Sequence, residues 1–354
     1  MADQENFRLC QEVSAEVVEY ELLFQRPART SRDVLQSRKI AFFILKDSDA
    51  RKGIGECAPI EGLSAEKFKD AFDALTRIAS RHISEEEFGR LLDAHSSARF
   101  AVESACMNYR SGQHGFLFSK QSFDPIKING LVWMNEIETM FSEAVEKIKA
   151  GFDVIKFKVG ALNFDEEREM IGRFRQKFPD VEIRLDANGA FDIQQVMNKL
   201  NALSVLNIHS IEQPIKQGQW HEMADVIENS LIPIALDEEL IGINASSEKE
   251  NMLELLKPHF IILKPSLHGG FSGCDEWIRL ADARGIGWWA TSALESSIGL
   301  NAIAQWVSTK NNKLPQGLGT GSLYTNNFPS PWSVKNGHLV FDATFNEKND
   351  PFAS

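Results

Sequence analysis

The sequence predicts an α/β protein that combines a closed (β/α)8-type barrel with a smaller α+β domain. Three observations support this prediction. The chain has 354 residues, which exceeds the roughly 250 residues that one such barrel needs. From residue 128 onward, short apolar runs recur at a near-constant spacing, and each is followed by a helix-like stretch. The first 115 residues show a different order, in which strand patterns come first and helical patterns follow.

The first 115 residues are expected to form one α+β unit. Residues 14–24 alternate in hydropathy before a polar stretch at 25–32, and residues 39–45 and 53–59 follow as further strand candidates. Residues 100–109 have the pattern of a buried helix. An earlier helix is indicated by four apolar residues that would share one face, namely Phe68, Phe72, Leu75 and Ile78.

Eight short apolar runs are expected to form the barrel strands. Their starts lie 24 to 28 residues apart, which leaves room for a strand, a helix and two loops. Repetition of this kind is typical of a (β/α)8 barrel. An open doubly wound sheet is disfavoured, because no run is followed by a GxGxxG or GxxxxGK[ST] phosphate-binding element. The runs cover residues 128–134, 154–160, 182–188, 209–214, 233–238, 260–266, 287–294 and 314–319.

The expected domains are therefore residues 1–115 and a barrel over residues 124–330. A Pro-Ser-Pro element at 329–331 separates the barrel from the last residues. The tail, 331–354, is too short to fold alone, so we expect it to return to the first domain.

The composition excludes several classes of function. A net charge of −12 argues against a nucleic-acid or anionic-membrane surface, while it permits a small anionic substrate held by local cations or a metal. The four cysteines form no CxxC pair and suggest no disulfide framework, which favours a cytoplasmic location. No apolar run is long enough to span a membrane, and the first twenty residues lack an apolar signal core. The oligomeric state is not predicted.

Three lysines are expected to face a molecule bound in the barrel. Alternate apolar side chains of residues 154–160 should face the helices, which turns Lys156 and Lys158 inward. Lys264 lies near the end of the sixth strand, opposite the second strand in an eight-membered ring. A bound molecule would therefore have Lys158 on one side and Lys264 on the other.

Three carboxylates are expected to converge where neighbouring strands end. Asp186, Glu212 and Asp237 close the third, fourth and fifth strands, which lie about 4.8 Å apart. Like charges this close repel unless a cation compensates them, and carboxylate oxygens suit Mg²⁺ or Mn²⁺. A single inward acid or lysine is often part of a structural ion pair. Several at one depth, at the catalytic end of a barrel, indicate an active site instead.

The histidines give a weaker signal. His209, His259 and His268 lie near strand ends, but no two of them have the spacing of metal ligands. Surface or loop positions are therefore expected for all three.

These elements resemble the enolase superfamily, specifically its muconate-lactonizing-enzyme-like branch. Residues 156–158 match its KxK motif, the three acids match its metal-ligand strands, and residues 263–265 match its strand-six lysine. Residues 53–59 and 99–101 are similar to parts of its capping domain. The resemblance covers nearly the whole chain. It implies a modified (β/α)8 TIM-type barrel with an α+β capping domain formed by the N-terminal region and the C-terminal tail.

Within this branch, residues 128–134, 292–297 and 317–321 are similar to the o-succinylbenzoate synthases. That resemblance implies a hydro-lyase of menaquinone biosynthesis. Its substrate is a small carboxylate, 2-succinyl-6-hydroxy-2,4-cyclohexadiene-1-carboxylate, which is dehydrated by syn elimination.

Two other functions are weighed against the synthase. Racemases or epimerases of N-acylamino acids or dipeptides are the alternative, since two opposed lysines also suit two-base epimerisation. Dipeptide epimerases, however, place acids where this chain has Gly319-Thr320-Gly321. A non-catalytic binding barrel would predict a broken set of site residues, whereas this set is complete.

The resemblance also implies a role for each site residue. Lys158 would act as the base and then as the acid, and Lys156 would lower the pKa of Lys158. Lys264 would stabilise the enediolate or, by cation–π contact, the developing ring. The metal ligands would be Asp186, Glu212 and Asp237, with Asn188 and Glu238 orienting ligands or a lysine. Ser292 and an arginine of the polar stretch 25–32, taken here as Arg29, are the candidate substrate contacts.

Overall fold

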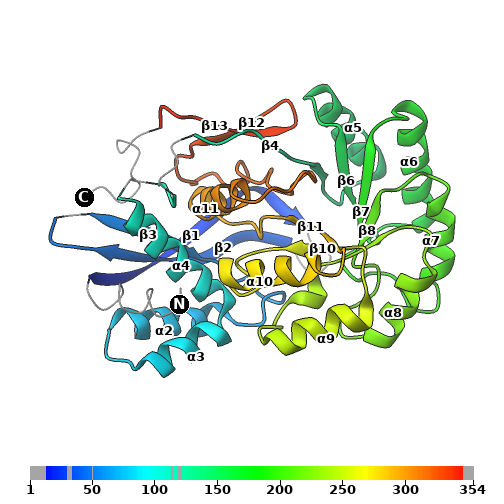
Figure 1. Ribbon diagram of the computed structural model, residues 1–354. Helices are drawn as coiled ribbons and strands as arrows, with labels where there is room; N and C mark the ends of the chain where they lie inside the picture. Colours follow the sequence, from blue (N-terminus) through cyan, green and yellow to red (C-terminus); the bar gives the residue numbers. More distant parts are fainter. Residues whose placement is uncertain (1–12, 30–33, 50, 113–114, 119–121, 346–354) are drawn as a thin grey trace.

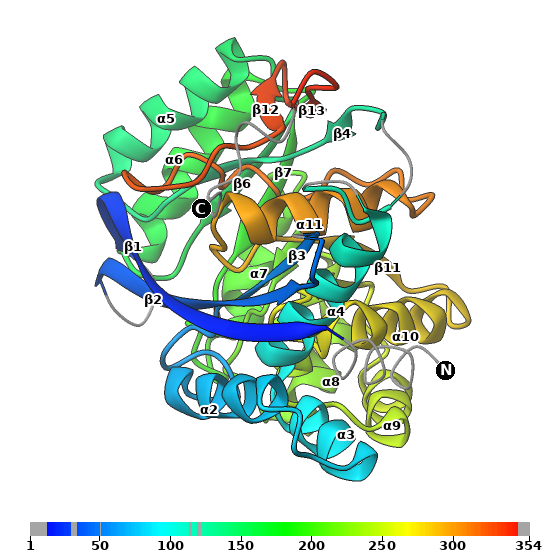
Figure 2. The ribbon, with the colours of Figure 1, turned by 90° about the vertical axis from the view of Figure 1, so that its left-hand side faces the viewer.

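The structure is a computed structural model that describes residues 13–29, 34–49, 51–112, 115–118 and 122–345. A curled parallel sheet surrounded by helices forms one side of the molecule (Figure 1). An antiparallel sheet with its own helices forms the other side, and a second view shows these helices packed under that sheet (Figure 2). This arrangement agrees with the predicted barrel and α+β domain.

The parallel sheet has the strand order β11-β10-β9-β8-β7-β6-β5, so each strand lies beside its neighbour in sequence. Every strand falls within a predicted run: β5 (Gly130–Val132), β6 (Val154–Lys158), β7 (Glu182–Asp186), β8 (Ser210–Glu212), β9 (Ile234–Leu236), β10 (Phe260–Leu263) and β11 (Gly287–Ala290). The connecting helices are α5 (Ile137–Lys149), α6 (Phe164–Lys177), α7 (Val196–Ser204), α8 (Trp220–Asn229), η1 (Glu238–Leu240), α9 (Ser246–Leu256), α10 (Gly270–Asp282) and α11 (Ser297–Ser308). Within the described ranges, no helix is both long and apolar enough to cross a membrane.

The eighth predicted strand differs from the others, because it is reduced to two isolated bridges. Gln316 bridges to Ile128 beside β5, and Gly317 bridges to Thr291 beside β11. The Gln316 side chain also accepts a hydrogen bond from the backbone N–H of Ala290, at 2.7 Å. The Ala290 N–H is therefore bonded to a side chain, whereas in a regular parallel ladder it would donate to a backbone carbonyl of the neighbouring strand. The barrel is closed at this point without a regular strand.

The described part of the N-terminal region contains the sheet β1-β2-β3 and three helices. Its elements are β1 (Ser14–Arg29), β2 (Val34–Lys46), β3 (Lys52–Cys57), α2 (Phe68–Ala79), α3 (Glu85–Ala94) and α4 (Ser96–Ser111). The polar stretch was expected to follow the first strand, yet β1 continues to Arg29. Its register with β2 shifts between Leu23 and Ala28, which accommodates Pro27 and its missing N–H.

The described part of the C-terminal tail lies beside the start of the barrel, and the expected return of the tail to the first domain stays a prediction. This part of the tail forms β12 (Trp332–Lys335) and β13 (His338–Phe341), and β13 pairs with β4 (Ile126–Lys127), just before the barrel. The rings of Trp332 and Phe341 pack on Phe123, with centroids 5.7 and 4.9 Å away. Burial of these rings holds the described part of the tail beside the start of the barrel.

Two buried carboxylates of the N-terminal region cap two barrel helices. Glu103 on α4 accepts from the backbone N–H of Phe271, at 2.6 Å, where α10 begins. Glu56 on β3 accepts from the backbone N–H groups of Ser296 and Gly299, at 2.9 and 2.8 Å, where α11 begins. Negative charge is favourable at a helix N-terminus. Because barrel helices begin near the C-terminal ends of the strands, these bonds hold the N-terminal region over that end of the barrel.

Glu103→Gln should change how stability depends on pH. Burial raises the pKa of Glu103 from its ordinary 4.5 to about 7. Since the folded state binds this proton more tightly, the stabilisation is complete below the unfolded pKa and is lost as pH rises through the folded one. We expect the wild type to lose free energy of unfolding relative to Glu103→Gln between pH 4.5 and 7. Urea denaturation of both proteins across this range is the measurement, and a pH-independent difference would contradict the assignment.

Candidate active site

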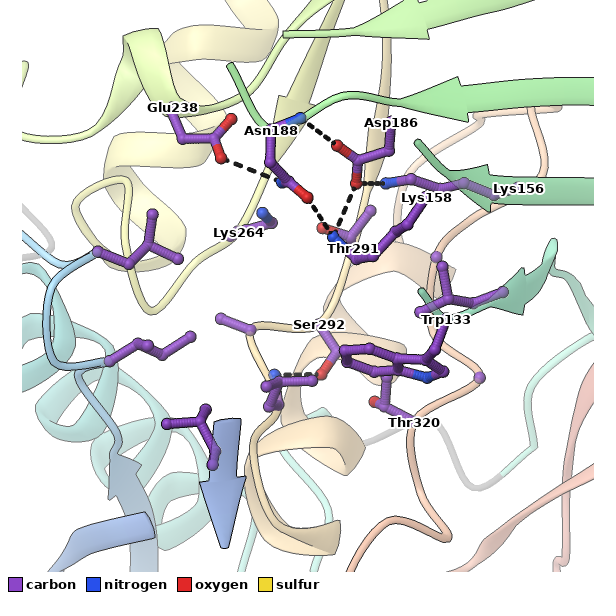
Figure 3. A pocket seen from close by; sticks show the side chains of 18 of the residues that line it. Trp133, Lys156, Lys158, Asp186, Asn188, Glu238, Lys264, Thr291, Ser292 and Thr320 are labelled. Carbon is purple, nitrogen blue, oxygen red and sulfur yellow. Dashed lines mark hydrogen bonds and ion pairs between the residues drawn. The ribbon is translucent and has the colours of Figure 1, made fainter. Parts of the chain in front are cut away.

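A cavity of about 390 Å³ lies at the C-terminal ends of the barrel strands, between the barrel and the N-terminal region. This volume is typical of small-molecule sites. Leu35 and residues 60–63 close the cavity from the N-terminal region. The lining includes most of the predicted site residues, namely Lys156, Lys158, Asp186, Asn188, Glu238, Lys264 and Ser292 (Figure 3). Glu212 and Asp237 are 2% and 0% exposed and are not part of the lining.

Lys156 joins the carboxylates of two neighbouring strands. Its Nζ lies 2.9 Å from Asp186 Oδ2 and 2.6 Å from Glu212 Oε2. Burial lowers the pKa of Lys156, but the two carboxylates outweigh burial and raise it above its ordinary value. Burial in turn favours the neutral form of Asp186, yet Lys156 and Lys158 hold the pKa of Asp186 below its usual range. Burial and the Asp186 charge raise the pKa of Glu212.

Lys158 and Lys264 reach the cavity from opposite parts of the barrel. Lys158 Nζ donates to Asn188 Oδ1 at 2.5 Å and to Asp186 Oδ2 at 3.2 Å. Lys264 donates to the carboxylate of Asp237. Burial lowers the pKa of Lys264, but the charges of Asp237 and other nearby carboxylates outweigh it and raise this pKa. The structure therefore brings together the lysines and acids that the sequence singled out.

The carboxylates have the chemistry of a divalent-cation site. Glu212 Oε1 and Asp237 Oδ1 are buried and have no hydrogen-bond partner among the described residues. Carboxylate oxygens are the ligands that Mg²⁺ and Mn²⁺ prefer. As the side chains stand, no three His, Cys, Asp or Glu residues of the described chain are grouped closely enough to hold an ion. Lysine ammonium groups form ion pairs with these carboxylates instead, so a metal ion would have to displace the ammonium groups.

Asn188 connects Lys158 to a further carboxylate. Its Nδ2 donates to Glu238 Oε1 at 3.1 Å, while its backbone N–H donates to Asp186 Oδ1 at 3.1 Å. The backbone of Asn188 has φ +44°, a left-handed conformation that asparagine tolerates better than most residues. Burial and the Asp237 charge raise the pKa of Glu238 to about 6. Hydrogen bonds thus link Lys158 through Asn188 to Glu238.

Ser292 and Arg29 are the two predicted substrate contacts. Ser292 lines the cavity, and its hydroxyl donates to Glu295 Oε2 at 2.7 Å and accepts from the Leu294 N–H at 3.0 Å. The bond to Glu295 uses the only proton of the Ser292 hydroxyl. This hydroxyl can therefore accept a hydrogen bond from a bound molecule but cannot donate one. The backbone of Arg29 ends β1, and its side chain lies outside the described residues.

Residues 139–344 match the family model described as enolase C-terminal domain-like. The chain belongs to the enolase superfamily. This superfamily member is 41% identical to an o-succinylbenzoate synthase from Desulfotalea psychrophila, over 90% of this chain and 96% of the relative. It is 25% identical to an L-Ala-D/L-Glu epimerase from Bacillus subtilis, over 81% of this chain and 82% of that relative.

A solved structure supports the same assignment. The crystal structure of MenC from Desulfotalea psychrophila superposes on the superfamily member described here with a TM-score of 0.82 and 36% identity, and covers 93% of this chain and 99% of that chain. The resemblance to the superfamily and the predicted fold class are therefore confirmed.

His268 supports the site of this superfamily member from outside the cavity lining. It was expected at the surface or in a loop, and it does lie in the turn between β10 and α10, but it is fully buried there. Its Nδ1 accepts from the backbone N–H of Lys264 at 3.0 Å, and burial lowers its pKa to about 3. The neutral ring thus fixes the backbone that carries Lys264. The four-residue spacing from Lys264, which is that of a helical turn, was the available signal.

One strand of the superfamily member contributes cavity residues that sequence reasoning missed. Asn129, Leu131 and Trp133 occupy alternate positions at the start of the barrel, and all three line the cavity. Side chains alternate between the two faces of a strand, so the inward direction of these three residues was predictable in the same way as that of Lys156 and Lys158. The Lys158 Nζ lies 5.9 Å from the centre of the Trp133 ring, so this indole forms a wall beside the lysine.

Proposed function

We propose that this protein is an o-succinylbenzoate synthase. It would dehydrate 2-succinyl-6-hydroxy-2,4-cyclohexadiene-1-carboxylate to o-succinylbenzoate in menaquinone biosynthesis. The observation that carries the proposal is the cavity itself, which has Lys158 and Lys264 on different sides and buried carboxylates behind them. The likeness to the Desulfotalea psychrophila synthase supports the choice of reaction.

Lys158 is the proposed base. It would remove the proton next to the ring carboxylate and return it to the hydroxyl, which leaves from the same face as water while the ring becomes aromatic. The Lys156 ammonium, paired with Asp186 and Glu212, lies two residues away on the same strand. Asn188 Oδ1, 2.5 Å from the Lys158 Nζ, fixes the direction in which that nitrogen faces.

Asp186, Glu212 and Asp237 are the proposed ligands of Mg²⁺, with Mn²⁺ as a substitute. The bound ion would supply positive charge to the ring carboxylate while negative charge develops there, as in other enolase-superfamily sites. Lys264 would face this charge from the other side of the substrate. With a cation on the carboxylates, Lys156 and Lys264 would lose the partners that now raise their pKa.

Epimerisation is the second candidate, because two lysines on different sides of the cavity could exchange protons on both faces of one carbon. The end of the eighth strand opposes the dipeptide version. It lines the cavity with Gly317, Gly319 and Thr320 and supplies no carboxylate for a substrate ammonium group. A buried ammonium without a partner costs several kcal/mol. Glu61, another acid in the lining, is exposed in the N-terminal region.

The deciding experiment compares substrates on one preparation of the protein. We expect a high kcat/KM for dehydration of the cyclohexadiene carboxylate and poor epimerisation of L-Ala-D/L-Glu at saturating Mg²⁺. N-succinylamino acids form the third arm. A preference for the dipeptide, or negligible dehydration, would overturn the synthase assignment and leave the fold and the cation site standing.

A further inference from the structure

The loop that follows β11 forms part of the cavity wall and has a strained backbone. Residues 291–294 line the cavity. Leu294 has φ +61°, which lies in the left-handed region that a residue with a branched side chain rarely adopts. Such a conformation persists only where its surroundings hold it. The groups that hold Leu294 therefore determine the shape of this wall.

Arg38, on β2 of the N-terminal region, binds this loop from outside, while Glu295 accepts from the Ala293 N–H within it at 2.7 Å. Arg38 Nη1 donates to the backbone carbonyls of Ala293 and of Leu294, the latter at 2.5 Å. Its Nη2 donates to the carbonyl of Ala58, which lies two residues before the segment 60–63 that closes the cavity from the N-terminal region. Arg38 is only 6% exposed and does not line the cavity. It thus joins two cavity walls from behind.

Tyr324 provides a second anchor for the same loop. Its hydroxyl donates to the Leu294 carbonyl at 2.5 Å, and its side chain is 3% exposed. The loop carbonyls are therefore directed away from the cavity and toward Arg38 and Tyr324.

We propose that Arg38 is a positioning residue that sets the separation of residues 60–63 from residues 291–294. These two segments face the part of the substrate that is remote from the carboxylate cluster, which for the proposed synthase is the succinyl arm. The inference rests on the proposed function only for the identity of that arm. A planar guanidinium holds its donors in a fixed fork on separate nitrogens, whereas a lysine ammonium carries its three donors on a single rotatable nitrogen. Arg38 would thus act on specificity without touching the substrate.

The test is Arg38→Lys, compared with a matched control elsewhere. We expect KM to rise about tenfold, equivalent to about 1.4 kcal/mol, while kcat changes less than about threefold, because the arm is held equally in the ground and transition states. Arg175 on α6 also donates to backbone carbonyls, those of Val181, Leu206 and Asn207, at 2.7, 3.0 and 2.8 Å, and lies outside the cavity lining. Arg175→Lys should lower Tm and leave KM unchanged.

A rescue experiment separates positioning from general stability. Glycine adopts φ +61° without the cost that leucine bears. Arg38→Lys should therefore raise KM less in a Leu294→Gly background than in the wild type, as measured by a double-mutant cycle. Independent effects of the two substitutions would count against the proposed link between Arg38 and Leu294.

Tyr324 offers a second variant for the same test. If Arg38→Lys does not fold, Tyr324→Phe removes the second anchor while keeping the ring, and it should raise KM in the same direction by a smaller factor. If Arg38→Lys merely lowers Tm as Arg175→Lys does, the inference is wrong. If the wild type does not dehydrate its proposed substrate, the proposed function fails instead. The same comparison is then made with the N-succinylamino acid or dipeptide that it does turn over.

Discussion

Lys158→Ala should abolish dehydration, with kcat falling by at least roughly 10²–10⁴-fold, the usual contribution of a general base. The Lys158 Nζ faces the cavity and is held by Asn188 and Asp186, so no other amine occupies its position. Single-turnover measurement of substrate loss separates this chemical step from binding. Alanine also removes a charge beside Asp186, so thermal unfolding of the variant should be recorded alongside.

The matched control is another lysine that lies over an aromatic ring. Lys199 Nζ is 4.7 Å from the centre of the Phe191 ring and lies outside the cavity lining, so Lys199→Ala should keep wild-type kcat. Activity near wild type in Lys158→Ala would place the base elsewhere.

Lys264→Arg provides an independent check on the one-base mechanism. It keeps a positive charge but changes its size and shape, and should lose dehydration activity. Solvent proton exchange that survives in Lys264→Arg and not in Lys158→Arg would favour Lys158 as the only base. Loss of exchange in both would favour the two-base alternative.

Much of the barrel could be predicted because each strand depends on local pattern. A parallel strand covered by helices needs a short apolar run, and seven of the eight runs contain such a strand. Residues 314–319 have the same pattern, but the Gln316 side chain takes the N–H of Ala290. That competition involves a partner 26 residues away in sequence, so hydropathy alone does not reveal it.

The site residues also differ in whether local sequence pattern predicts their positions. Residues whose direction follows from strand alternation, such as Lys156, Lys158 and Asp186, lie in the cluster that the sequence indicated. His268 was misjudged because its burial depends on a turn rather than a strand. The role of Arg38 could not be predicted, since its carbonyl partners Ala293 and Leu294 are 255 and 256 residues away and carbonyls have no sequence signature.

Removing divalent cations should abolish activity, and added Mg²⁺ should restore it. Without a cation, Lys156 remains paired with Asp186 and Glu212, and Lys264 with Asp237, so neither lysine is available to a substrate. A cation on the buried Glu212 Oε1 and Asp237 Oδ1 would satisfy oxygens that otherwise lack partners among the described residues. The measurement is activity against free Mg²⁺ after treatment with a chelator, with Mn²⁺ as a second series.

Asp237→Asn should lower the maximal rate and shift the Mg²⁺ dependence of activity to a much higher concentration. Loss of a residue that only orients a metal ligand typically weakens metal affinity by roughly 10–100-fold, so we expect loss of a ligand to weaken it at least as much. The asparagine amide is neutral, so the ion faces one negative charge fewer, and Lys264 loses its ion pair with residue 237. Asp225, an exposed acid on α8, is the matched control, and Asp225→Asn should keep the wild-type curve. Full activity of the wild type in excess chelator would refute the cation site. An unchanged Mg²⁺ curve in Asp237→Asn would remove Asp237 from it, because a carboxylate that binds the ion cannot lose its charge without weakening that bond.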